Sequence, residues 1–518
     1  MKVLLLDPTS PHSFWTFDRT VKGGGKKALL PSLGLITVAA LLPKDWEVRY
    51  VDTRFQPMGE QTWEWPDLIM ISGMIIQKEG MLRLIQEAKQ RGKSVAVGGP
   101  YVTSLPEEVM AAGADFVIKG EAETALPAFL DALERGETSG VFEEPRKPDL
   151  TESPIPRFDL LDMDSYLVMG VQTSRGCPFD CEFCDIVNLY GRHPRYKSAD
   201  QVIAELDYIF SLGWRGDVFV SDDNFIGSRK HALAILDKLI PWIEGHGYPY
   251  GFWTQVSVNL GQDLEMIDLM TAANFGYVFV GIESPDEEVL ALTRKFQNIR
   301  NPLAESIHSI NANGLSIVGS FVIGFDNEKK GMDDRICEFV DQTHIPIVML
   351  NNLQAAPNTA LWKRLKRENR LRKNETHGGL IEGRMNFVPS RPEAEILGEY
   401  FNIIDRLYEP RAYLKRAHEY YMTMRPTRRA LARRDGIEPP KKTDVDNRPS
   451  RPFWLVVLHV LRIAWKHWIR PRYRRKAFRE FLEICIKNPS RMRAYINCLA
   501  LGENLFSIRD DFRRNGQP

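Results

Sequence analysis

Three cysteines in one short loop constrain this chain more than any other feature of its sequence. Cys177, Cys181 and Cys184 follow a C-x3-C-x2-C spacing in the stretch SRGCPFDCEFCDI. Three thiolates on such a loop can hold three irons of a four-iron four-sulfur cluster, whereas ordinary ferredoxin clusters are closed by four cysteines. The fourth iron is then open to a substrate or a cofactor. The spacing therefore predicts chemistry at an iron and not electron transfer alone.

A zinc site is the alternative interpretation of these cysteines. Structural zinc takes four ligands, and the nearest histidine is His193. The predicted strand before the loop and the motifs after it favour the iron–sulfur cluster. The other cysteines, Cys337, Cys485 and Cys498, are isolated in apolar surroundings and are interpreted as buried packing residues.

The composition is that of a globular protein with two or three domains. The chain has 518 residues, of which 43% are hydrophobic and 26% charged, and its formal net charge is zero. That total hides a split, because residues 411–518 carry 26 Lys and Arg against 10 Asp and Glu. Such asymmetry indicates a basic module that meets an anionic partner. The first residues, MKVLLLDPTSPHSFW, lack the features of a signal peptide, so we expect a cytoplasmic protein.

Residues 1–150 alternate apolar runs with amphipathic helical patterns. This alternation predicts a Rossmann-like, doubly wound parallel α/β domain, in which ligands bind at the carboxyl ends of the strands. The expected strands are Lys2–Leu6, Glu47–Asp52, Leu68–Ser72, Ser94–Gly98 and Phe116–Lys119. The candidate ligand contacts that follow them are Ser72, Gly73, Gly98, Gly99, Gly120 and Glu121. Glycines let a bulky ligand approach the backbone, although simple turns would use them too. No G-x-G-x-x-G follows the first strand, which disfavours a dinucleotide.

Residues 166–375 contain a second β/α series that begins just before the cysteines. Six units are too few for a complete eight-fold barrel, so we expect an open, six-unit partial (β/α) barrel. Its expected strands are Val171–Ser174, Asp217–Ser221, Gly251–Ser257, Tyr277–Glu283, Ser316–Phe325 and Ile345–Leu353.

The cysteine loop resembles that of the radical S-adenosylmethionine superfamily, because it follows the first barrel strand and has Phe183 before its last cysteine. The resemblance implies that the open iron chelates S-adenosylmethionine, which is cleaved to a 5′-deoxyadenosyl radical. The strings CEFCDI, LYGRHPR, DDNFIG, GIESPD and LQAAPNTALWKRL narrow the likeness. They resemble a branch of cobalamin-binding radical enzymes that includes the bacterial hopanoid methylases, and the likeness spans the whole chain.

The first domain resembles the cobalamin-binding domain that precedes many radical enzymes, but it departs from the soluble cobalamin carriers. Those carriers have D-x-H-x-x-G after the first strand, and the histidine ligates cobalt. Here Asp7 is followed by Pro8 and Thr9, and His12 is out of register. If cobalamin binds, we expect no histidine ligand on its lower face.

The resemblance also implies which residues contact S-adenosylmethionine, although it names no catalytic residue. The superfamily usually has Gly-Gly-Glu after the second barrel strand to receive the substrate's ammonium group, whereas this chain has carboxylates, which suit a cation. A solvated loop is the alternative for those two carboxylates. The implied contacts are Asp222 and Asp223, then Gln255 and Ser257, Glu283, and Gly319 and Gly324 near the adenine.

Residues 376–518 are expected to form a mainly helical, basic domain with a flexible linker at about 424–452. Residues 453–468, FWLVVLHVLRIAWKHW, are too short and too interrupted by charge to span a bilayer. With the basic string at 470–476, they suit an interfacial helix on anionic lipid. A core helix that docks on the barrel is the other interpretation. No recognised nucleic-acid module accompanies the basic string.

These observations favour a cobalamin-dependent radical methyltransferase with a four-iron four-sulfur cluster, S-adenosylmethionine and cobalamin. The expected substrate is a small apolar molecule, either a terpenoid lipid of the hopanoid kind or a tetrapyrrole, and not a nucleic acid. The expected partners are a reductase, flavodoxin or ferredoxin as electron donor, with peripheral contact at the inner membrane face through 453–476 left open. Two alternatives remain: radical cyclisation, oxidation or carbon–carbon bond formation without methyl transfer, and a non-catalytic iron–sulfur sensor or scaffold.

Overall fold

A six-stranded, all-parallel sheet forms the first part of the chain. The computed structural model describes residues 1–11, 16–372, 384–436 and 474–514. The strand order is β2-β1-β3-β4-β5-β6, and a parallel sheet of this order places ligands at the carboxyl edge, where the order reverses between β1 and β3. The strands are β1 (Lys2–Asp7), β2 (Glu47–Asp52), β3 (Leu68–Ser72), β4 (Ser94–Gly98), β5 (Phe116–Lys119) and β6 (Gly140–Glu143). The five expected strands are confirmed. Sequence reasoning missed β6, because this edge strand is exposed or half-buried throughout and has no apolar run.

Helices cover both faces of this sheet, as its strand sequences require. Along β1, Val3 and Leu5 face one apolar core, and Leu4 and Leu6 face another. Successive side chains of a strand point to opposite faces, so an unbroken apolar run needs cover on both sides. The first core lies under α2 (Leu33–Leu41) and α7 (Ala122–Glu134), and the second under α4 (Lys78–Gln90), α5 (Pro100–Ser104) and α6 (Pro106–Ala111).

A second six-stranded parallel sheet forms the open partial barrel that was expected. Its order is β7-β10-β11-β12-β13-β14, so each strand pairs with the next strand of the series. The strands are β7 (Val168–Val171), β10 (Asp217–Val220), β11 (Phe252–Val256), β12 (Phe275–Glu283), β13 (Ser316–Ile323) and β14 (Ile347–Asn352). The helices between them include α8 (Ile186–Tyr190), α9 (Ala199–Ser211), α10 (Arg229–Gly245), α11 (Leu264–Ala272), α12 (Glu287–Leu292), α13 (Leu303–Ala312) and α14 (Met332–Thr343).

The first barrel strand differs from the expectation. It spans Val168–Val171 and not Val171–Ser174. Thr173 and Ser174 leave the sheet because Asp222 binds their backbone and side chains. Ser174 instead starts the short strand β8 (Ser174–Arg175), which pairs antiparallel with β9 (Arg195–Tyr196) at the base of the cysteine loop.

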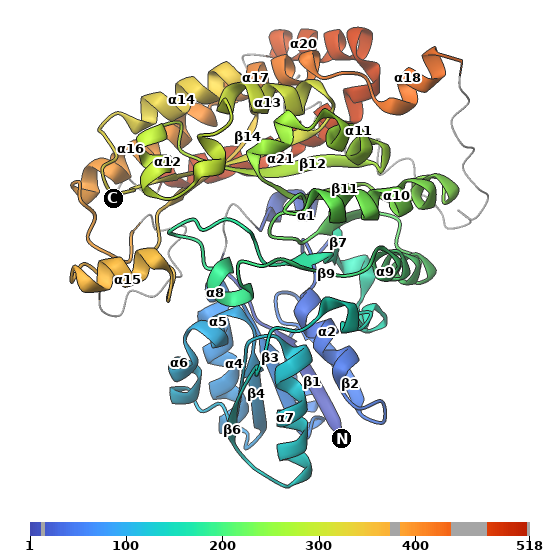
Figure 1. Ribbon diagram of the computed structural model, residues 1–518, viewed down its shortest axis with the longest axis vertical. Helices are drawn as coiled ribbons and strands as arrows, with labels where there is room; N and C mark the ends of the chain where they lie inside the picture. The colour runs from blue at the N-terminus through green and yellow to red at the C-terminus, as the bar shows by residue number, and fades with distance from the viewer. Residues whose placement is uncertain (12–15, 373–383, 437–473, 515–518) are drawn as a thin grey trace.

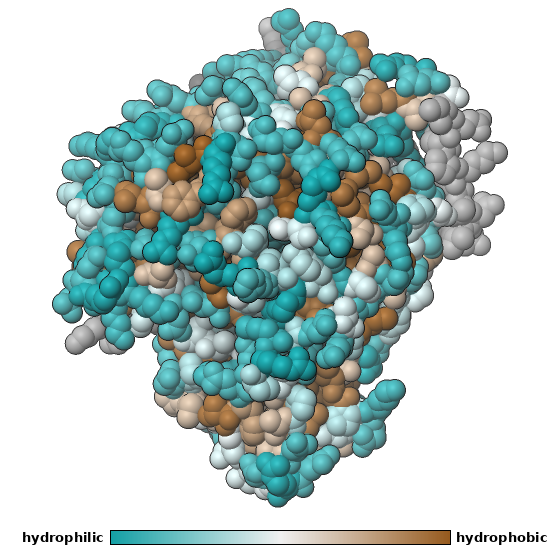
Figure 2. Space-filling view, viewed as in Figure 1, coloured by the Kyte–Doolittle hydropathy of each residue, from teal (hydrophilic) through white to brown (hydrophobic). Residues whose placement is uncertain are grey.

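A helical layer of the last part of the chain packs on β12 to β14 and their helices. It contains α16 (Glu393–Leu407), α17 (Pro410–Thr423), α18 (Arg428–Arg434), α20 (Arg474–Lys487) and α21 (Met492–Arg514), and α15 (Ala360–Arg367) precedes it. Buried tyrosines connect it to the barrel: the Tyr420 hydroxyl accepts a hydrogen bond from the Ile317 amide at 2.7 Å. Figure 1 shows α17, α18 and α20 at the end of the molecule opposite the first sheet. The face in Figure 2 is mostly hydrophilic, with apolar residues in patches between.

The structure bears in different ways on the expectations for the linker, for the segment 453–468 and for the isolated cysteines. Residues 424–436, the start of the expected linker, are ordered: Met424 is buried, and Arg425 pairs with Asp268 at 2.9 Å. The rest of the linker and the segment 453–468 lie outside the described residues. Cys337 and Cys498 are buried as expected, but Cys485 is only partly buried, with its thiol 3.5 Å from the Met492 sulfur. No helix in the described ranges has the length and apolarity needed to cross a membrane.

Candidate cofactor site

The carboxyl edge of the first sheet faces the mouth of the barrel, where the cysteine loop lies (Figure 1). Arg175, at the base of the cysteine loop after β7, donates a hydrogen bond to Glu121, just after β5, at 2.8 Å. Asn358, after β14, donates one to the Ser104 carbonyl of α5 at 3.3 Å. Ligand-binding edges of two parallel sheets therefore meet across one interface, so groups bound at the two edges would face each other.

The cysteine loop is half-buried beside a cation. Cys177, Cys181 and Cys184 are free thiols, and burial raises the pKa of Cys177 to about 11. Burial alone would lower the pKa of Lys295, but Glu283 and the thiols of Cys181 and Cys184 raise it above its usual value. A neighbouring cation favours thiolates, so binding of a cluster would release thiol protons next to a fixed positive charge.

The thiols suit a cluster better than a single ion. In the part of the chain that the structure describes, no group of three His, Cys, Asp or Glu is arranged to hold one metal ion. His193 is exposed. The thiols nevertheless lie close enough for Cys181 to affect the pKa of both Cys177 and Cys184. This donor set fits a cluster in which each cysteine serves a different iron.

Asp222 binds Thr173 and Ser174, which lie between β7 and the cysteine loop, and both of its carboxylate oxygens accept hydrogen bonds. Its carboxylate is fully buried. It accepts hydrogen bonds from the Thr173 amide at 2.7 Å, from the Ser174 amide at 3.0 Å and from the Ser174 hydroxyl at 2.7 Å, and the Thr173 hydroxyl donates a further one. Burial raises the pKa of Asp222, and these donors oppose the rise. Both oxygens of Asp222 thus already have donors, which favours a positioning role over the expected contact with S-adenosylmethionine.

Asp223 is the carboxylate of the pair that remains available. Only one of its oxygens accepts a hydrogen bond within the described residues, from the Gly176 amide at 2.8 Å. Burial raises the pKa of Asp223 to about 7, against the effect of the Gly176 amide. The carboxylate also influences the pKa of Cys177. Asp223 thus lies beside the cysteine loop with a free oxygen.

The end of β11 carries a polar cluster that sequence reasoning found in part. The Ser257 amide donates to the Asn224 side-chain oxygen at 3.2 Å, and the Asn224 amide group donates to the Ser257 hydroxyl at 3.1 Å. Gln255, two positions earlier on the same face, is half-buried, and its carbonyl accepts a hydrogen bond from the Phe225 amide. Asn224 belongs to the DDNFIG string, but its pairing with Ser257 was not predicted, because only the fold brings it to the neighbouring strand end.

Glu283 ends β12 in a strained, left-handed backbone conformation with φ of 64°. Its carboxylate pairs with Lys295 at 2.7 Å. A Cβ on Gly281 would lie 2.4 Å from the Glu283 carboxylate and 3.0 Å from the Lys295 nitrogen, so this glycine makes room for the pair. Non-glycine residues with positive φ concentrate at functional sites. Lys295, which sequence reasoning missed, connects Glu283 to the cysteines.

The two glycines expected near the adenine have structural reasons of their own. A Cβ on Gly319 would meet Ile282 at 3.1 Å, inside the apolar packing behind the sheet. Gly324 has a φ of 94°, its amide donates to Glu328 at 2.9 Å, and a Cβ there would lie 2.8 Å from the Met385 sulfur. Packing or backbone geometry therefore accounts for each glycine, and contact of either one with the adenine stays a prediction.

The candidate cobalamin contacts at the ends of β3 and β4 lie at the carboxyl edge of the first sheet. Ser72 and Gly98 are partly exposed, Gly73 is buried, and neighbouring Met74 is 60% exposed. Gly99 has a φ of 93°, and a Cβ on it would lie 2.4 Å from the Ser72 hydroxyl, so the two loops close against each other. The edge therefore offers backbone and one apolar side chain to a flat ligand.

Gly120 and Glu121, which follow β5, are enclosed by protein side chains. A Cβ on Gly120 would collide with Glu144 at 2.4 Å, and Glu121 is buried under Arg175 and Arg195. The expectation that Glu121 contacts cobalamin is not supported, because both of its oxygens accept hydrogen bonds from these arginines.

The end of β1 is filled by protein side chains. Asp7 accepts hydrogen bonds from Tyr50 at 3.0 Å, Gln77 at 3.0 Å and Arg54 at 3.1 Å. Burial raises the pKa of Asp7 to about 6. His12 lies outside the described residues.

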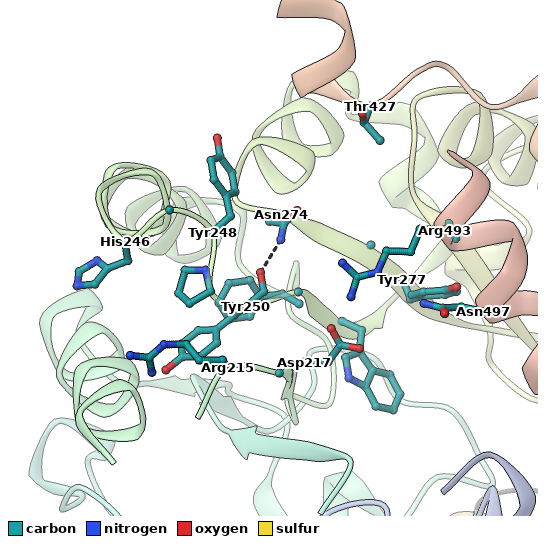
Figure 3. Close-up of a pocket in the computed structure, with 18 of the residues that line it drawn as sticks. Arg215, Asp217, His246, Tyr248, Tyr250, Asn274, Tyr277, Thr427, Arg493 and Asn497 are labelled. Atoms are coloured by element: carbon teal, nitrogen blue, oxygen red, sulfur yellow. Dashed lines mark hydrogen bonds between the residues drawn. The ribbon is translucent and has the colours of Figure 1, made fainter. Parts of the chain in front are cut away.

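A cavity of about 420 Å³ opens at the other end of the barrel (Figure 3). It lies where β10, β11 and β12 begin, and Asp217, Tyr277, Arg493 and Asn497 line it. The cysteine loop lies at the opposite, carboxyl ends of these strands, so this cavity is separate from the cofactor site.

Three family models match the chain. The B12 binding domain matches residues 27–130, the radical SAM superfamily residues 171–340, and a domain of unknown function (DUF4070) residues 359–517. Their order agrees with the order of the two sheets and the helical layer.

Curated relatives match over most of their length. The chain is 45% identical to an uncharacterised methyltransferase of Synechocystis over 99% of this chain and 93% of that one. It is 34% identical to the hopanoid C-2 methylase of Rhodopseudomonas palustris over 82% of this chain and 81% of that one. It is 25% identical to the bacteriochlorophyllide d C-12(1)-methyltransferase of Chlorobaculum tepidum over 70% of this chain and 78% of that one.

A solved structure shares the fold. The radical S-adenosylmethionine methyltransferase TsrM of Kitasatospora setae, solved with cobalamin and an iron–sulfur cluster, superposes with a TM-score of 0.60 at 16% identity. The match covers 92% of this chain and 98% of that one. Together with the cysteine loop that faces the carboxyl edge of the first sheet, these matches show that the chain belongs to the cobalamin-dependent radical S-adenosylmethionine methyltransferases, whose cofactors are a four-iron four-sulfur cluster, S-adenosylmethionine and cobalamin.

Proposed function

We propose that this enzyme transfers a methyl group to an unactivated carbon of a polycyclic terpenoid lipid. The observation that carries the proposal is the 34% identity with a hopanoid C-2 methylase over 82% of this chain. The barrel interior supports it. Side chains that point away from the outer helices stay partly exposed on β10, β11 and β12, and they include Phe219, Trp253 and Phe279. The Phe219 and Trp253 rings lie 4.5 Å apart. Trp253 also lines the cavity at the amino ends of the strands, so this pair would give an apolar substrate an aromatic wall at that end of the barrel interior.

The residues of this chain would hold and orient the cofactors. When bound, these groups supply the radical and the methyl group. Cys177, Cys181 and Cys184 hold the cluster in this proposal. The free oxygen of Asp223 would accept a hydrogen bond from the ammonium group of S-adenosylmethionine, and Ser257 and Gln255 would contact its polar part. Glu283 acts through Lys295, which keeps a positive charge beside the cysteines.

Heterologous expression tests the substrate class. We expect a hopanoid-producing host that lacks its own hopanoid methylase to accumulate hopanoids heavier by one methylene when it expresses this chain, as seen by mass spectrometry. A Cys181→Ala variant is the matched control, because it removes one expected iron ligand and should give no product. Unchanged hopanoids with an active, cluster-loaded enzyme would contradict the terpenoid proposal.

A tetrapyrrole is the second candidate substrate. It is supported by the 25% identity with a bacteriochlorophyllide methyltransferase, and an aromatic wall also suits a flat macrocycle. Incubation of the reconstituted enzyme with each substrate class separates the two, since only the true substrate should form a methylated product in step with 5′-deoxyadenosine.

Two partners complete the proposal. A flavodoxin, ferredoxin or reductase would deliver the electron, and the rate of 5′-deoxyadenosine formation with each purified donor tests this. Peripheral contact with the inner membrane face would bring the enzyme near a lipid substrate. The described part of the basic region that supports such contact is α20, whose outer face is apolar.

A further inference from the structure

The base of the cysteine loop contains an unfavourable charge pair. In the two-stranded ribbon of β8 and β9, Arg175 lies directly opposite Arg195. Like charges opposite each other on an antiparallel ladder destabilise the pairing. Two strands of two residues each contribute little stability of their own. The ribbon therefore needs negative charge from elsewhere to stay closed.

The first sheet domain supplies that charge. Glu121 accepts hydrogen bonds from Arg175 at 2.8 Å and from Arg195 at 2.6 and 3.0 Å. Glu123 accepts two more from Arg175, at 2.8 and 3.0 Å. Both carboxylates belong to the turn and first residues of α7, on the far side of the domain interface. The two arginines are thus bridged by carboxylates of another domain.

The bridge is buried, which makes each member depend on the others. The side chains of Glu121, Glu123 and Arg175 are only 3%, 6% and 11% exposed. Removal of one partner from a buried ion pair leaves an uncompensated charge and is strongly destabilising. A further contact holds the same loop, because Lys147 donates a hydrogen bond to the Leu189 carbonyl in α8.

We propose that Glu121 and Glu123 are positioning residues that close the ribbon of the cysteine loop only when the cobalamin-binding domain is docked on the barrel. The loop begins two residues after Arg175 and ends just before Arg195. Docking of one cofactor domain thereby shapes the cluster site of the other. This role goes beyond the proposed methyl transfer and holds for any substrate.

Hydrogen exchange of the full-length, cluster-free protein tests the proposal without activity. In the double variant Glu121→Gln with Glu123→Gln, we expect amides of residues 172–197 to exchange roughly ten-fold faster or more than in the unchanged protein. Reconstituted cluster should also be lost faster to a chelator. Lys89→Gln is the control, because it breaks an ion pair of 2.7 Å with Asp115 inside the first domain, and it should leave this segment unchanged.

A double-mutant cycle separates charge bridging from ordinary packing. Arg195→Gln alone should loosen the ribbon, because Glu121 loses a partner. In the Glu121→Gln background the same change should slow exchange again, because the repulsion between the arginines is gone. Independent packing effects would instead add. Additive effects in the cycle, or unchanged exchange in the variant with both glutamates replaced, would overturn the proposal. Should that variant unfold as a whole, the cycle of single changes decides.

Discussion

At the scale of single residues, neighbours in the sequence have different roles in the site. Asp222 and Asp223 follow the same strand, yet Asp222 accepts four hydrogen bonds from Thr173 and Ser174, whereas Asp223 accepts one from Gly176. The sequence predicted a pair of carboxylates at this strand end. It did not indicate which one keeps a free oxygen, because that depends on donors from another strand.

Replacement of each aspartate should therefore affect a different property of the protein. Asp222→Asn turns one acceptor into a donor that faces other donors, so we expect a loss of about 2–4 kcal/mol in unfolding free energy and a lower iron content after reconstitution. Asp223→Asn should fold and hold iron normally but bind S-adenosylmethionine more weakly. Denaturant unfolding, iron analysis and calorimetry measure these effects. Normal stability in the Asp222 variant, or lost iron in the Asp223 variant, would contradict the assignment.

At the scale of elements, short ribbons and helix starts position the loop more than long strands do. β9 packs against the first turn of α10, where the Tyr196 and His231 ring centroids lie 4.2 Å apart. Burial lowers the pKa of His231 to about 4. The sequence did not indicate this contact, because β9 has only two residues and no apolar pattern.

This histidine should make the fold sensitive to acid. An unfolded chain protonates His231 near its usual pKa of 6.5, whereas the folded chain does so only near 4. The stability that the neutral ring contributes is present above pH 6.5 and is lost as the pH falls towards 4. We expect His231→Gln to reduce this loss, as measured by chemical unfolding at pH 7.5 and pH 5. Parallel pH dependence in both proteins would show that His231 is not responsible.

At the scale of the whole molecule, the basic excess of residues 411–518 is only partly used inside the fold. Arg509 and Arg513 pair with Asp405, and Arg425 and Arg428 pair with Asp268. The outer face of α20 is different. Phe478, Leu482 and Ile486 follow one another at four-residue intervals and are 46%, 42% and 78% exposed. Exposed basic residues flank them: Arg479, and Lys476 and Lys487, which pair with Glu480 and Glu483 of the same helix.

This apolar face with cationic edges should bind anionic membranes. Replacement of Phe478, Leu482 and Ile486 by serine removes apolar area that would insert among lipids, so we expect binding to vesicles that contain anionic lipid to fall several-fold in sedimentation. Leu264→Ser with Leu292→Ser is the control, since these residues are 57% and 51% exposed on other helices. Equal binding by all three proteins would argue against the surface, and a change in mass by light scattering would indicate self-association instead.

The sequence by itself determined the cofactor chemistry and the order of the architecture. The spacing of Cys177, Cys181 and Cys184 and the alternation of apolar runs are local properties of the sequence. Local properties can be recognised without knowledge of the fold. The tertiary structure decided which residues do the work around them. Glu121 was expected to contact cobalamin but bridges two arginines, and Gly319 was expected near the adenine but relieves the packing of Ile282. The contacts of Lys295 with Glu283 and of Asn224 with Ser257 became apparent only in the tertiary structure. The reason is that burial, hydrogen-bond partners and ion pairs depend on segments far apart in the chain. Those of Lys295, Asn224 and Gly319 meet when the barrel forms, and those of Glu121 meet when the two sheets dock.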